Sequence, residues 1–180
     1  MDLKDLQIDK QWTLFLDRDG VINKKLDDDY VKNIEEFSFI KGSKEAIAVF
    51  NLLFGRIVVV TNQQGIGKGL MSKQDLKEVH DYMELELVKA GAHLDKIYYC
   101  PELAESNASC RKPNTGMAEE ARKDFPEIDF KKSIMIGDSL SDMQMGKRVG
   151  MVTLFITDEE VVMKEADFQF KSLAEIAKSL

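Results

Sequence analysis

The feature that most constrains this chain is an apolar run that ends in two aspartates. Residues 12–16 are apolar or β-favouring without interruption, and Asp17, Arg18, Asp19 and Gly20 follow at once. A continuous run of this kind predicts a strand buried on both faces of a parallel sheet, which Gly20 ends. Side chains alternate along a strand, so we expect Asp17 and Asp19 on one side and Arg18 pointing away. Two neighbouring buried carboxylates require a cation or a shared proton.

Further apolar runs alternate with helix-like segments along the rest of the chain. The runs cover residues 56–61, 94–99, 133–137, 151–155 and 166–170, and the helix-like segments cover residues 43–53, 72–90, 114–125, 141–149 and 173–180. Strands that alternate with helices in this way predict parallel pairing. We therefore expect an α/β fold, with one Rossmann-like domain over residues 1–180. Its central, mainly parallel sheet should carry helices on both faces.

Two of the helix-like segments carry start signals. Ser43 is the expected N-cap of the segment 43–53, and Ser72, three residues before Asp75, predicts a capping box at the start of the segment 72–90. His80 lies on the apolar stripe of that second segment. A histidine in such a place is packed or half-exposed far more often than it is catalytic, so we expect a packed or half-exposed side chain there.

Composition excludes several classes of function. The chain has 180 residues, of which 44% are apolar, and a net charge of −7, so a basic surface for nucleic acid is not expected. No apolar run reaches membrane-spanning length, and the charged first ten residues do not resemble a signal peptide. Two cysteines, Cys100 and Cys110, are too few for a disulfide framework. We expect them to be small structural residues of a cytoplasmic protein.

Polar side chains stand at the end of each of the first four predicted strands. Thr61 and Asn62 end the second, Arg111 and Lys112 lie beyond the third, and Asp138 ends the fourth, with Asp142 four residues later. The carboxyl ends of parallel strands meet at one edge, so these residues should lie beside the two aspartates of the first strand. Carboxylates suit Mg²⁺, and the hydroxyl and the cation could hold phosphoryl oxygens. The edge therefore predicts phosphoryl transfer, with residues 24–41 as a wall.

The glycine-rich loop 61–69 does not carry a nucleotide-binding motif. A Walker loop needs a hydroxyl after its lysine, but Gly69 follows Lys68. The glycines at 65, 67 and 69 also miss the spacing of the dinucleotide fingerprint. ATP or NAD binding by these routes is therefore not expected.

Four motifs in this order resemble those of the haloacid dehalogenase superfamily of hydrolases: Asp17-x-Asp19-x-Val21, Thr61 at a strand end, Lys112, and Gly137-Asp138-x3-Asp142. The resemblance covers residues 12–155. Within it, the stretches 16–23, 59–65, 97–101 and 110–117 are similar to the D-glycero-D-manno-heptose 1,7-bisphosphate phosphatases. Histidinol-phosphate phosphatases share much of the pattern. The resemblance implies a haloacid dehalogenase-type domain without a large cap and a sugar bisphosphate as substrate.

The same resemblance implies roles for the acidic residues. Asp17 would be the nucleophile that forms an aspartyl-phosphate, and Asp19 would be the general acid and base. Mg²⁺ would be bound by Asp17, the main-chain carbonyl of Asp19 and Asp138. Asp142 would sit behind them and orient the ion and Lys112.

Other residues would bind the substrate if the resemblance holds. Thr61 and Lys112 would hold the transferring phosphoryl group, and Arg111 would reach the second phosphate or sugar oxygens. The full set of expected substrate- or phosphate-binding residues is Asn23, Thr61, Asn62, Gln63, Arg111 and Lys112. The expected partner is a small phosphorylated sugar, without nucleic acid or membrane, and the expected state is a monomer.

One departure concerns a zinc loop that relatives often carry before Arg-Lys-Pro. The four matching positions here are Cys100, Glu102, Ala108 and Cys110, so only two possible ligands remain. A structural zinc site needs four ligands, and we therefore expect no zinc.

Three alternatives to a sugar phosphatase stay open. The first is a histidinol-phosphate phosphatase. The second is a nucleic-acid 3′-phosphatase, against which the net charge of −7 counts. The third is a non-enzymatic phosphoacceptor or binding domain, which would not need a second acid at Asp19. The sequence leaves the preferred anomer of a heptose substrate open.

Overall fold

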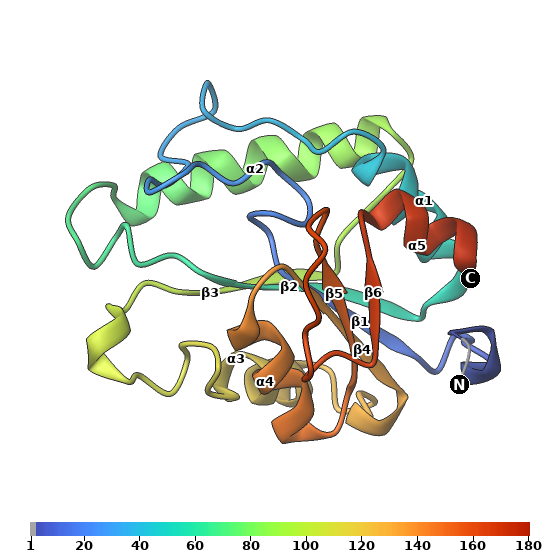
Figure 1. Ribbon diagram of the computed structural model, residues 1–180. Helices are drawn as coiled ribbons and strands as arrows, with labels where there is room; N and C mark the ends of the chain where they lie inside the picture. Colours follow the sequence, from blue (N-terminus) through green and yellow to red (C-terminus); the bar gives the residue numbers. More distant parts are fainter. Residues whose placement is uncertain (1–2) are drawn as a thin grey trace.

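The computed structural model describes residues 3–180, and their centre is one sheet of six parallel strands (Figure 1). The spatial order is β3-β2-β1-β4-β5-β6. The strands are β1 (Thr13–Leu16), β2 (Arg56–Asn62), β3 (Lys96–Cys100), β4 (Ser133–Gly137), β5 (Val152–Ile156) and β6 (Phe168–Phe170). The α-helices are α1 (Ser43–Leu53), α2 (Lys73–Lys89), α3 (Gly116–Asp124), α4 (Leu140–Val149) and α5 (Leu173–Ser179). Short 3₁₀ turns cover Leu3–Leu6, Ala104–Ser106 and Phe130–Lys132. The predicted α/β class and parallel pairing are confirmed.

Helices cover both faces of the sheet, as the continuous apolar strands require. Leu14 and Leu16 of β1 belong to a core cluster with residues of α1, α2 and α5, whereas Phe15 belongs to a second cluster with residues of α3 and α4. The same alternation runs through β2 and β4. Figure 1 shows α1, α2 and α5 on one side of the sheet and α3 and α4 on the other. The central strands therefore carry apolar side chains on both faces, because both faces of the sheet are covered.

The central strands run in parallel and end at one edge of the sheet, where β2 continues past the end of β1 to Asn62. Leu16, the last residue of β1, is paired with Val59 of β2 on one side and with Ile136 of β4 on the other. After β1 the chain first builds β2 and β3 on one side and then crosses to β4 on the other. The carboxyl end of β1 is thus the point where the direction of winding reverses, which is where open α/β sheets bind ligands.

Helix starts follow the sequence signals only in part. The capping box of α2 is confirmed, because Ser72 Oγ accepts from the Asp75 N–H at 3.0 Å and Asp75 Oδ2 accepts from the Ser72 N–H at 2.7 Å. The expected Ser43 N-cap is wrong. Gly42 is the N-cap, and Ser43 lies inside α1, where its hydroxyl donates to the Ile22 carbonyl at 2.9 Å. The hydroxyl thereby ties α1 to the loop that follows β1.

The cysteines also differ from expectation. A disulfide joins Cys100, the last residue of β3, to Cys110, two residues before Lys112. The loop between them turns back so that their Cα atoms are 5.4 Å apart, a separation that a disulfide spans. The expectation of two small structural residues without a disulfide is therefore wrong, and the cysteines no longer support the expected cytoplasmic location.

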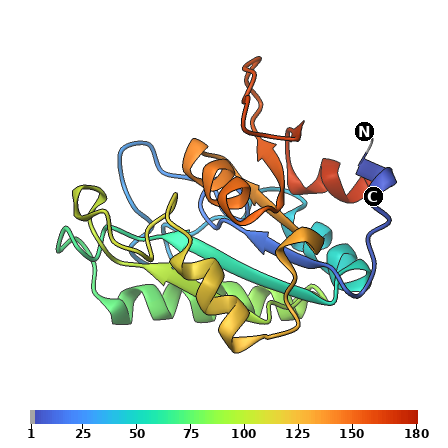
Figure 2. The same ribbon diagram turned by 90° about the horizontal axis from the view of Figure 1, so that it is seen from below.

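Two features of the periphery complete the fold. The segment between β5 and β6 projects from one side of the molecule (Figure 2). Among the helices of residues 3–180, none combines the length and the apolar character that a membrane crossing needs.

Removal of the Phe50 side chain tests the core beneath α1. Phe50 is fully buried and packs edge-on against Phe54, with ring centroids 6.1 Å apart. Phe50→Ala should lower the free energy of unfolding by about 3–5 kcal/mol, because it removes buried apolar surface and leaves a cavity. Urea denaturation measures the change. Leu52→Ala, on the same helix but 75% exposed, is the matched control and should change stability by less than about 0.5 kcal/mol. Equal losses in the two variants would contradict this account of the core.

Candidate active site

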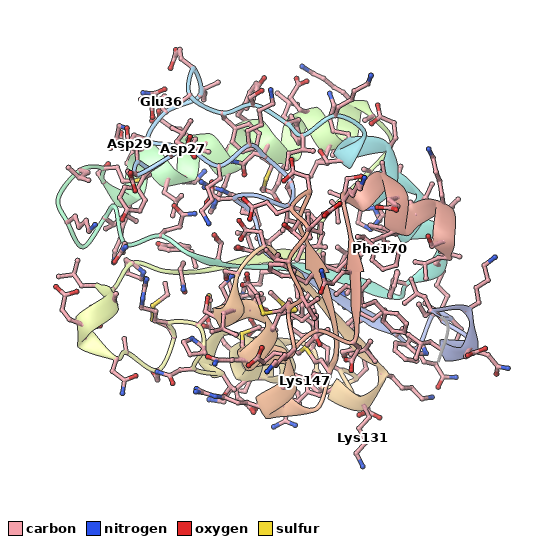
Figure 3. The ribbon with its side chains drawn as sticks, in the orientation of Figure 1. Asp27, Asp29, Glu36, Lys131, Lys147 and Phe170 are labelled. Carbon is pink, nitrogen blue, oxygen red and sulfur yellow. A yellow bond between two sulfur atoms is a disulfide. The ribbon has the colours of Figure 1, made fainter. Side chains whose placement is uncertain are left out.

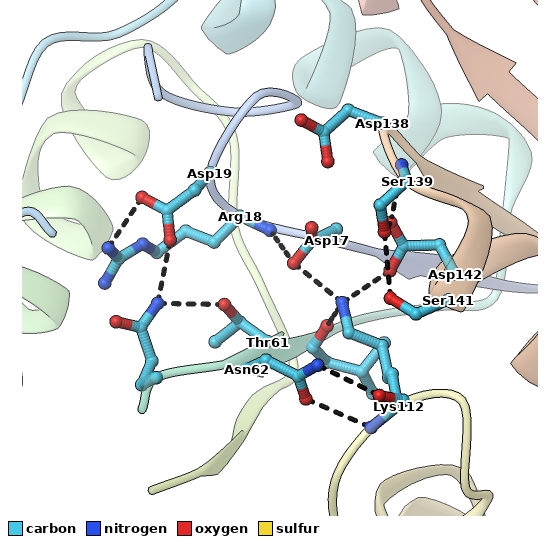
Figure 4. A network of polar contacts seen from close by, with 12 residues as sticks. Asp17, Arg18, Asp19, Thr61, Asn62, Lys112, Asp138, Ser139, Ser141 and Asp142 are labelled. Carbon is cyan, nitrogen blue, oxygen red and sulfur yellow. Dashed lines mark hydrogen bonds and ion pairs between the residues drawn. The ribbon is translucent and has the colours of Figure 1, made fainter. Parts of the chain in front are cut away.

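The candidate site lies at the carboxyl edge of the sheet, where β1 ends between β2 and β4 (Figure 4). Asp17 directly follows β1, and its N–H donates to the Ile136 carbonyl of β4 at 2.9 Å, so the strand ladder fixes its backbone. Thr61 lies at the end of β2, and Asp138 directly follows β4. Side chains from three neighbouring strand ends thus meet at one point.

A buried lysine links these strand ends to a helix. The Lys112 ammonium lies 2.8 Å from Asp17 Oδ1 and 2.6 Å from Asp142 Oδ1, and it donates to the Val60 carbonyl at 2.8 Å. Burial alone would lower the pKa of Lys112, but Asp142 and Asp17 outweigh it and hold the pKa above its ordinary value. All three ammonium protons face acceptors, so Lys112 is a fixed positive charge beside Asp17.

Asn62 holds the backbone of this lysine in place. Its Nδ2 donates to the Lys112 carbonyl at 3.2 Å, and its Oδ1 accepts from the Lys112 N–H at 3.0 Å. Both ends of the amide are therefore engaged, although the residue also lines the cavity described below. The structure gives Asn62 a role in positioning Lys112 that the sequence did not indicate.

Three carboxylates form a cluster that fits a divalent cation. Asp17, Asp138 and Asp142 each place an oxygen within 4.8 Å of the others. Burial raises the pKa of Asp17 to about 7, because Lys112 only partly offsets it and both other carboxylates add to it. Burial likewise raises the pKa of Asp138. An added cation would relieve this excess of negative charge, and hard oxygen ligands suit Mg²⁺.

The members of this cluster differ in how free their oxygens are. Asp142 is fully buried, with Oδ1 on Lys112 and Oδ2 accepting from the N–H and the hydroxyl of Ser139. Asp138 is paired at 3.1 Å with Lys25, whose side chain is mostly exposed. Within residues 3–180, Oδ2 of Asp17 accepts no hydrogen bond. Asp17 and Asp138 are thus the carboxylates free to bind an ion, and Asp142 stands behind them.

Gly20 makes the room that Asp138 occupies. Its φ is +83°, and a Cβ placed on it would lie 2.2 Å from Asp138 Oδ2. A side chain at this position would therefore push the Asp138 carboxylate out of the cluster. The absence of a Cβ and the left-handed backbone both favour glycine here.

Asp19 is held by donors on both of its oxygens. Oδ1 accepts from Arg18 Nη2 at 2.8 Å and from Asn23 Nδ2 at 2.9 Å, and Oδ2 accepts from Gln63 Nε2 at 2.8 Å. Burial alone would raise the pKa of Asp19, but the Arg18 guanidinium and the hydrogen bonds lower it. The expectation that Arg18 points away from Asp19 is wrong, because β1 ends at Leu16 and strand alternation does not extend to Arg18.

Two residues expected to touch substrate lie behind the site instead. Asn23 and Gln63 are buried, and their amides are directed at Asp19. Gln63 Nε2 also donates to Thr61 Oγ1 at 2.9 Å, which leaves the Thr61 hydroxyl its own proton for donation. The geometry therefore gives these two amides a positioning role and leaves Thr61 at the cavity surface.

A cavity of about 500 Å³ opens above these groups. Asp17, Asp19, Thr61, Lys112 and Asp138 line its floor. Residues 25, 26 and 28–31 of the loop between β1 and α1 form one wall, which is part of the segment 24–41 that the sequence predicts there. Asp27, Asp29 and Glu36 lie along this loop (Figure 3), and Lys32 pairs with the latter two at 2.8 and 3.2 Å.

The mouth of the cavity carries cations that the sequence indicated only in part. Arg111 lines it and donates to the Glu102 carbonyl at 3.2 Å, and Lys25 and Lys68 line it as well. Burial lowers the pKa of Arg111. Tyr30, whose hydroxyl accepts from Gln64 at 2.8 Å, joins the wall to the loop after β2. The position of Lys25, shortly after the two aspartates, was the available signal for its role.

Arg18 and His80 were the residues that the sequence least suggested. Arg18 is fully buried, and its Nη1 lies 3.1 Å from His80 Nε2 of α2. His80 is packed, as expected, and burial together with Arg18 lowers its pKa to about 3. The signal for a buried Arg18 was its place between two aspartates at the end of a buried strand, where its side chain has no access to solvent.

Sequence comparison finds relatives along nearly the whole chain. A family model described as HAD-hydrolase-like matches residues 109–176. The D-glycero-alpha-D-manno-heptose-1,7-bisphosphate 7-phosphatase of Campylobacter jejuni is 44% identical over 169 residues, covering 93% of this chain and 94% of the relative. The D-glycero-beta-D-manno-heptose-1,7-bisphosphate 7-phosphatase of Pasteurella multocida is 36% identical over 176 residues, covering 92% and 94%.

Structural comparison agrees with these relatives. The crystal structure of D,D-heptose 1,7-bisphosphate phosphatase from B. bronchiseptica, complexed with magnesium and phosphate, matches with a TM-score of 0.84 at 30% identity. The match covers 93% of this chain and 96% of that one. On the strength of the long match to the Campylobacter jejuni sequence, the chain belongs to the D-glycero-D-manno-heptose-1,7-bisphosphate 7-phosphatase family of the haloacid dehalogenase-like hydrolases.

Proposed function

We propose that this protein is a Mg²⁺-dependent phosphatase that removes the 7-phosphate of D-glycero-D-manno-heptose 1,7-bisphosphate through an aspartyl-phosphate. One observation carries the proposal: the Asp17 carboxylate lines the cavity with Oδ1 on the fixed charge of Lys112 and Oδ2 without a hydrogen bond within residues 3–180, and Asp138 lies close enough to share an ion with it. A carboxylate so placed is suited to attack phosphorus once its negative charge is screened. Family membership supplies the class of substrate.

In the first step, Asp17 takes the phosphoryl group. Its Oδ2 forms a bond to phosphorus while the bond between phosphorus and the C7 oxygen breaks. Asp19 donates a proton to that leaving oxygen, which departs as an alcohol. The approach of the phosphate's negative charge raises the pKa of a neighbouring carboxyl and so favours the protonated Asp19 that this step needs.

In the second step, water releases the phosphate. Asp19, now a carboxylate, takes a proton from the attacking water, whose oxygen forms a bond to phosphorus. The bond between phosphorus and Asp17 Oδ2 breaks, and the free carboxylate returns. The products are inorganic phosphate and heptose 1-phosphate, and Asp19 ends protonated for the next turnover.

The surrounding residues hold the transferring group. The Thr61 hydroxyl donates to one of its oxygens, and Lys112 places positive charge beside it. Asp17, Asp138 and the main-chain carbonyl of Asp19 would hold Mg²⁺, with Asp142 behind. When bound, the ion supplies positive charge that offsets the negative charge of carboxylate and phosphate.

The cations at the cavity mouth suit the second phosphate. Arg111 can offer two parallel N–H groups to phosphate oxygens, and Asn62 keeps the adjoining Lys112 backbone in place. For the anomer, we infer the α form, because the relative with 44% identity is named for α and the one with 36% for β.

Substrate preference is the first test. With Mg²⁺ present, phosphate release from the α and β heptose bisphosphates is compared with release from fructose 1,6-bisphosphate and histidinol phosphate. We expect the highest kcat/KM for the α heptose, with the C1 phosphate retained in the ³¹P NMR spectrum of the product. A preference for histidinol phosphate would overturn the substrate while leaving the chemistry in place.

Substitution of the nucleophile tests the chemistry. Asp17→Asn should lower kcat by about 10³-fold or more, because an amide oxygen does not form the covalent intermediate. Asp27→Asn, an exposed carboxylate on the wall loop, is the matched control and should keep wild-type activity. Brief acid quench with ³²P-labelled substrate should trap labelled protein in the wild type only. Retained activity in Asp17→Asn would contradict the proposed mechanism.

A pair of glycine substitutions tests the cation site. Gly20→Ala should weaken Mg²⁺ binding, measured by calorimetry without substrate, by about 10-fold or more, because the new Cβ displaces Asp138 Oδ2. Gly69→Ala is the control: its φ of +70° carries similar backbone strain, but a Cβ there meets nothing within 4 Å. Equal Mg²⁺ affinity in the two variants would contradict a role for Asp138 in holding the ion.

A further inference from the structure

Arg18 lies behind the site with its charge fully enclosed. It has no exposed surface, and the carboxylate at 2.8 Å, that of Asp19, is its ion-pair partner within residues 3–180. Its Nε has no hydrogen-bond partner in the same range. A buried guanidinium held by one carboxylate is costly unless its remaining donors are well placed. Nη2 faces Asp19, so the orientation of the Arg18 guanidinium depends on the partner of its other terminal nitrogen, Nη1.

His80 accepts from that donor. Its Nε2 lies 3.1 Å from Arg18 Nη1. A guanidinium carries only donors, so Nε2 must be the unprotonated nitrogen and the ring proton must sit on Nδ1. The ring is therefore neutral, which agrees with the low pKa that burial and Arg18 give it. His80 comes from α2, and its ring also meets Tyr99 of β3, with centroids 6.3 Å apart.

The guanidinium thus joins a rigid helix to the proposed acid and base. One end of it is fixed on His80, and the other holds Asp19 Oδ1, the oxygen that also accepts from Asn23. Oδ2 is then left on the side of Gln63 and Thr61, at the cavity. Loss of the His80 contact would free the guanidinium to turn, and the Asp19 carboxylate would turn with it.

We propose that Arg18 and His80 are a positioning pair that fixes the Asp19 carboxylate in the orientation for proton transfer to the leaving oxygen. The inference rests on the proposed function, because it requires Asp19 to be the acid. Neither residue lines the active-site cavity. A misplacement of about 1 Å is enough to reduce catalysis severely, so a contact outside the cavity can control the rate.

The pair acts on protonation of the leaving oxygen. Substrates with different leaving groups distinguish a loss of this protonation from a general loss of activity. An alkyl phosphate needs its leaving oxygen protonated, whereas p-nitrophenol leaves as a stable anion and does not. kcat/KM reports on the steps up to release of the alcohol and excludes the later hydrolysis. Damage to the nucleophile or to the cation site lowers both values of kcat/KM, so a fall in the ratio of kcat/KM for the heptose bisphosphate to that for p-nitrophenyl phosphate indicates loss of the acid function.

His80→Phe removes the acceptor and should lower this ratio about 10-fold or more, within the range that a general acid contributes. His80→Gln, whose side-chain carbonyl can accept from Arg18, should restore most of the ratio. His93→Phe, at the other and exposed histidine, should leave it unchanged. In an Asp19→Asn background, His80→Phe should cause no further loss, because the group that it orients is already gone.

The outcomes separate this inference from the proposed function. If Asp19→Asn does not lower the ratio, Asp19 is not the acid and the proposed function itself fails. If Asp19→Asn lowers the ratio but His80→Phe does not, only the positioning pair is overturned. Should His80→Phe fail to fold by circular dichroism, Arg18→Lys, which keeps the charge but not the fork, is expected to lower the ratio in the same way. An unchanged ratio in Arg18→Lys overturns the inference.

Discussion

The contact on which the rest of the site depends is the enclosed ammonium of Lys112 between Asp17 and Asp142. It reaches two carboxylates and the Val60 carbonyl, so one charge ties together the end of β1, the strand β2 and the start of α4. Removal of a single partner from such an arrangement leaves an uncompensated buried charge. The position of the ammonium depends on the position of the Lys112 main chain. This explains why the Asn62 side chain bonds both the N–H and the carbonyl of Lys112.

Much of the fold and the convergence of the site could be predicted, because both follow from short-range patterns. Unbroken apolar strands such as β1 require cover on both faces, and Leu14 and Phe15 indeed enter different cores. Parallel strands place their carboxyl ends together, so Asp17 and Asp138 had to be neighbours if β1 and β4 were. Neither inference needed the details of any loop.

The parts that sequence reasoning missed depend on how loops return to the sheet. The amides of Asn23 and Gln63 come from the separate loops after β1 and β2, and no local pattern records that both reach Asp19. Arg18 was misplaced because strand alternation was carried beyond the last residue of β1. Cys100 and Cys110 become partners only because the intervening loop doubles back. In each case the path of a loop decides the contact, and the spacing of the residues in the chain does not indicate that path.

The common edge at which the parallel strands end also separates the two ends of the molecule. The side chains that line the cavity come from strand ends, from the loops that follow them and from the start of α4, whereas the turns that precede β3 and β5 lie at the opposite end. Gly91 and Gly150 there have open space around them, with nothing within 4 Å of a Cβ. Mutational drift, an inserted peptide or an immobilisation tether at those turns would leave catalysis alone. One extra residue inside β1, by contrast, would turn its apolar side chains to the opposite faces and carry Asp17 out of reach of phosphorus.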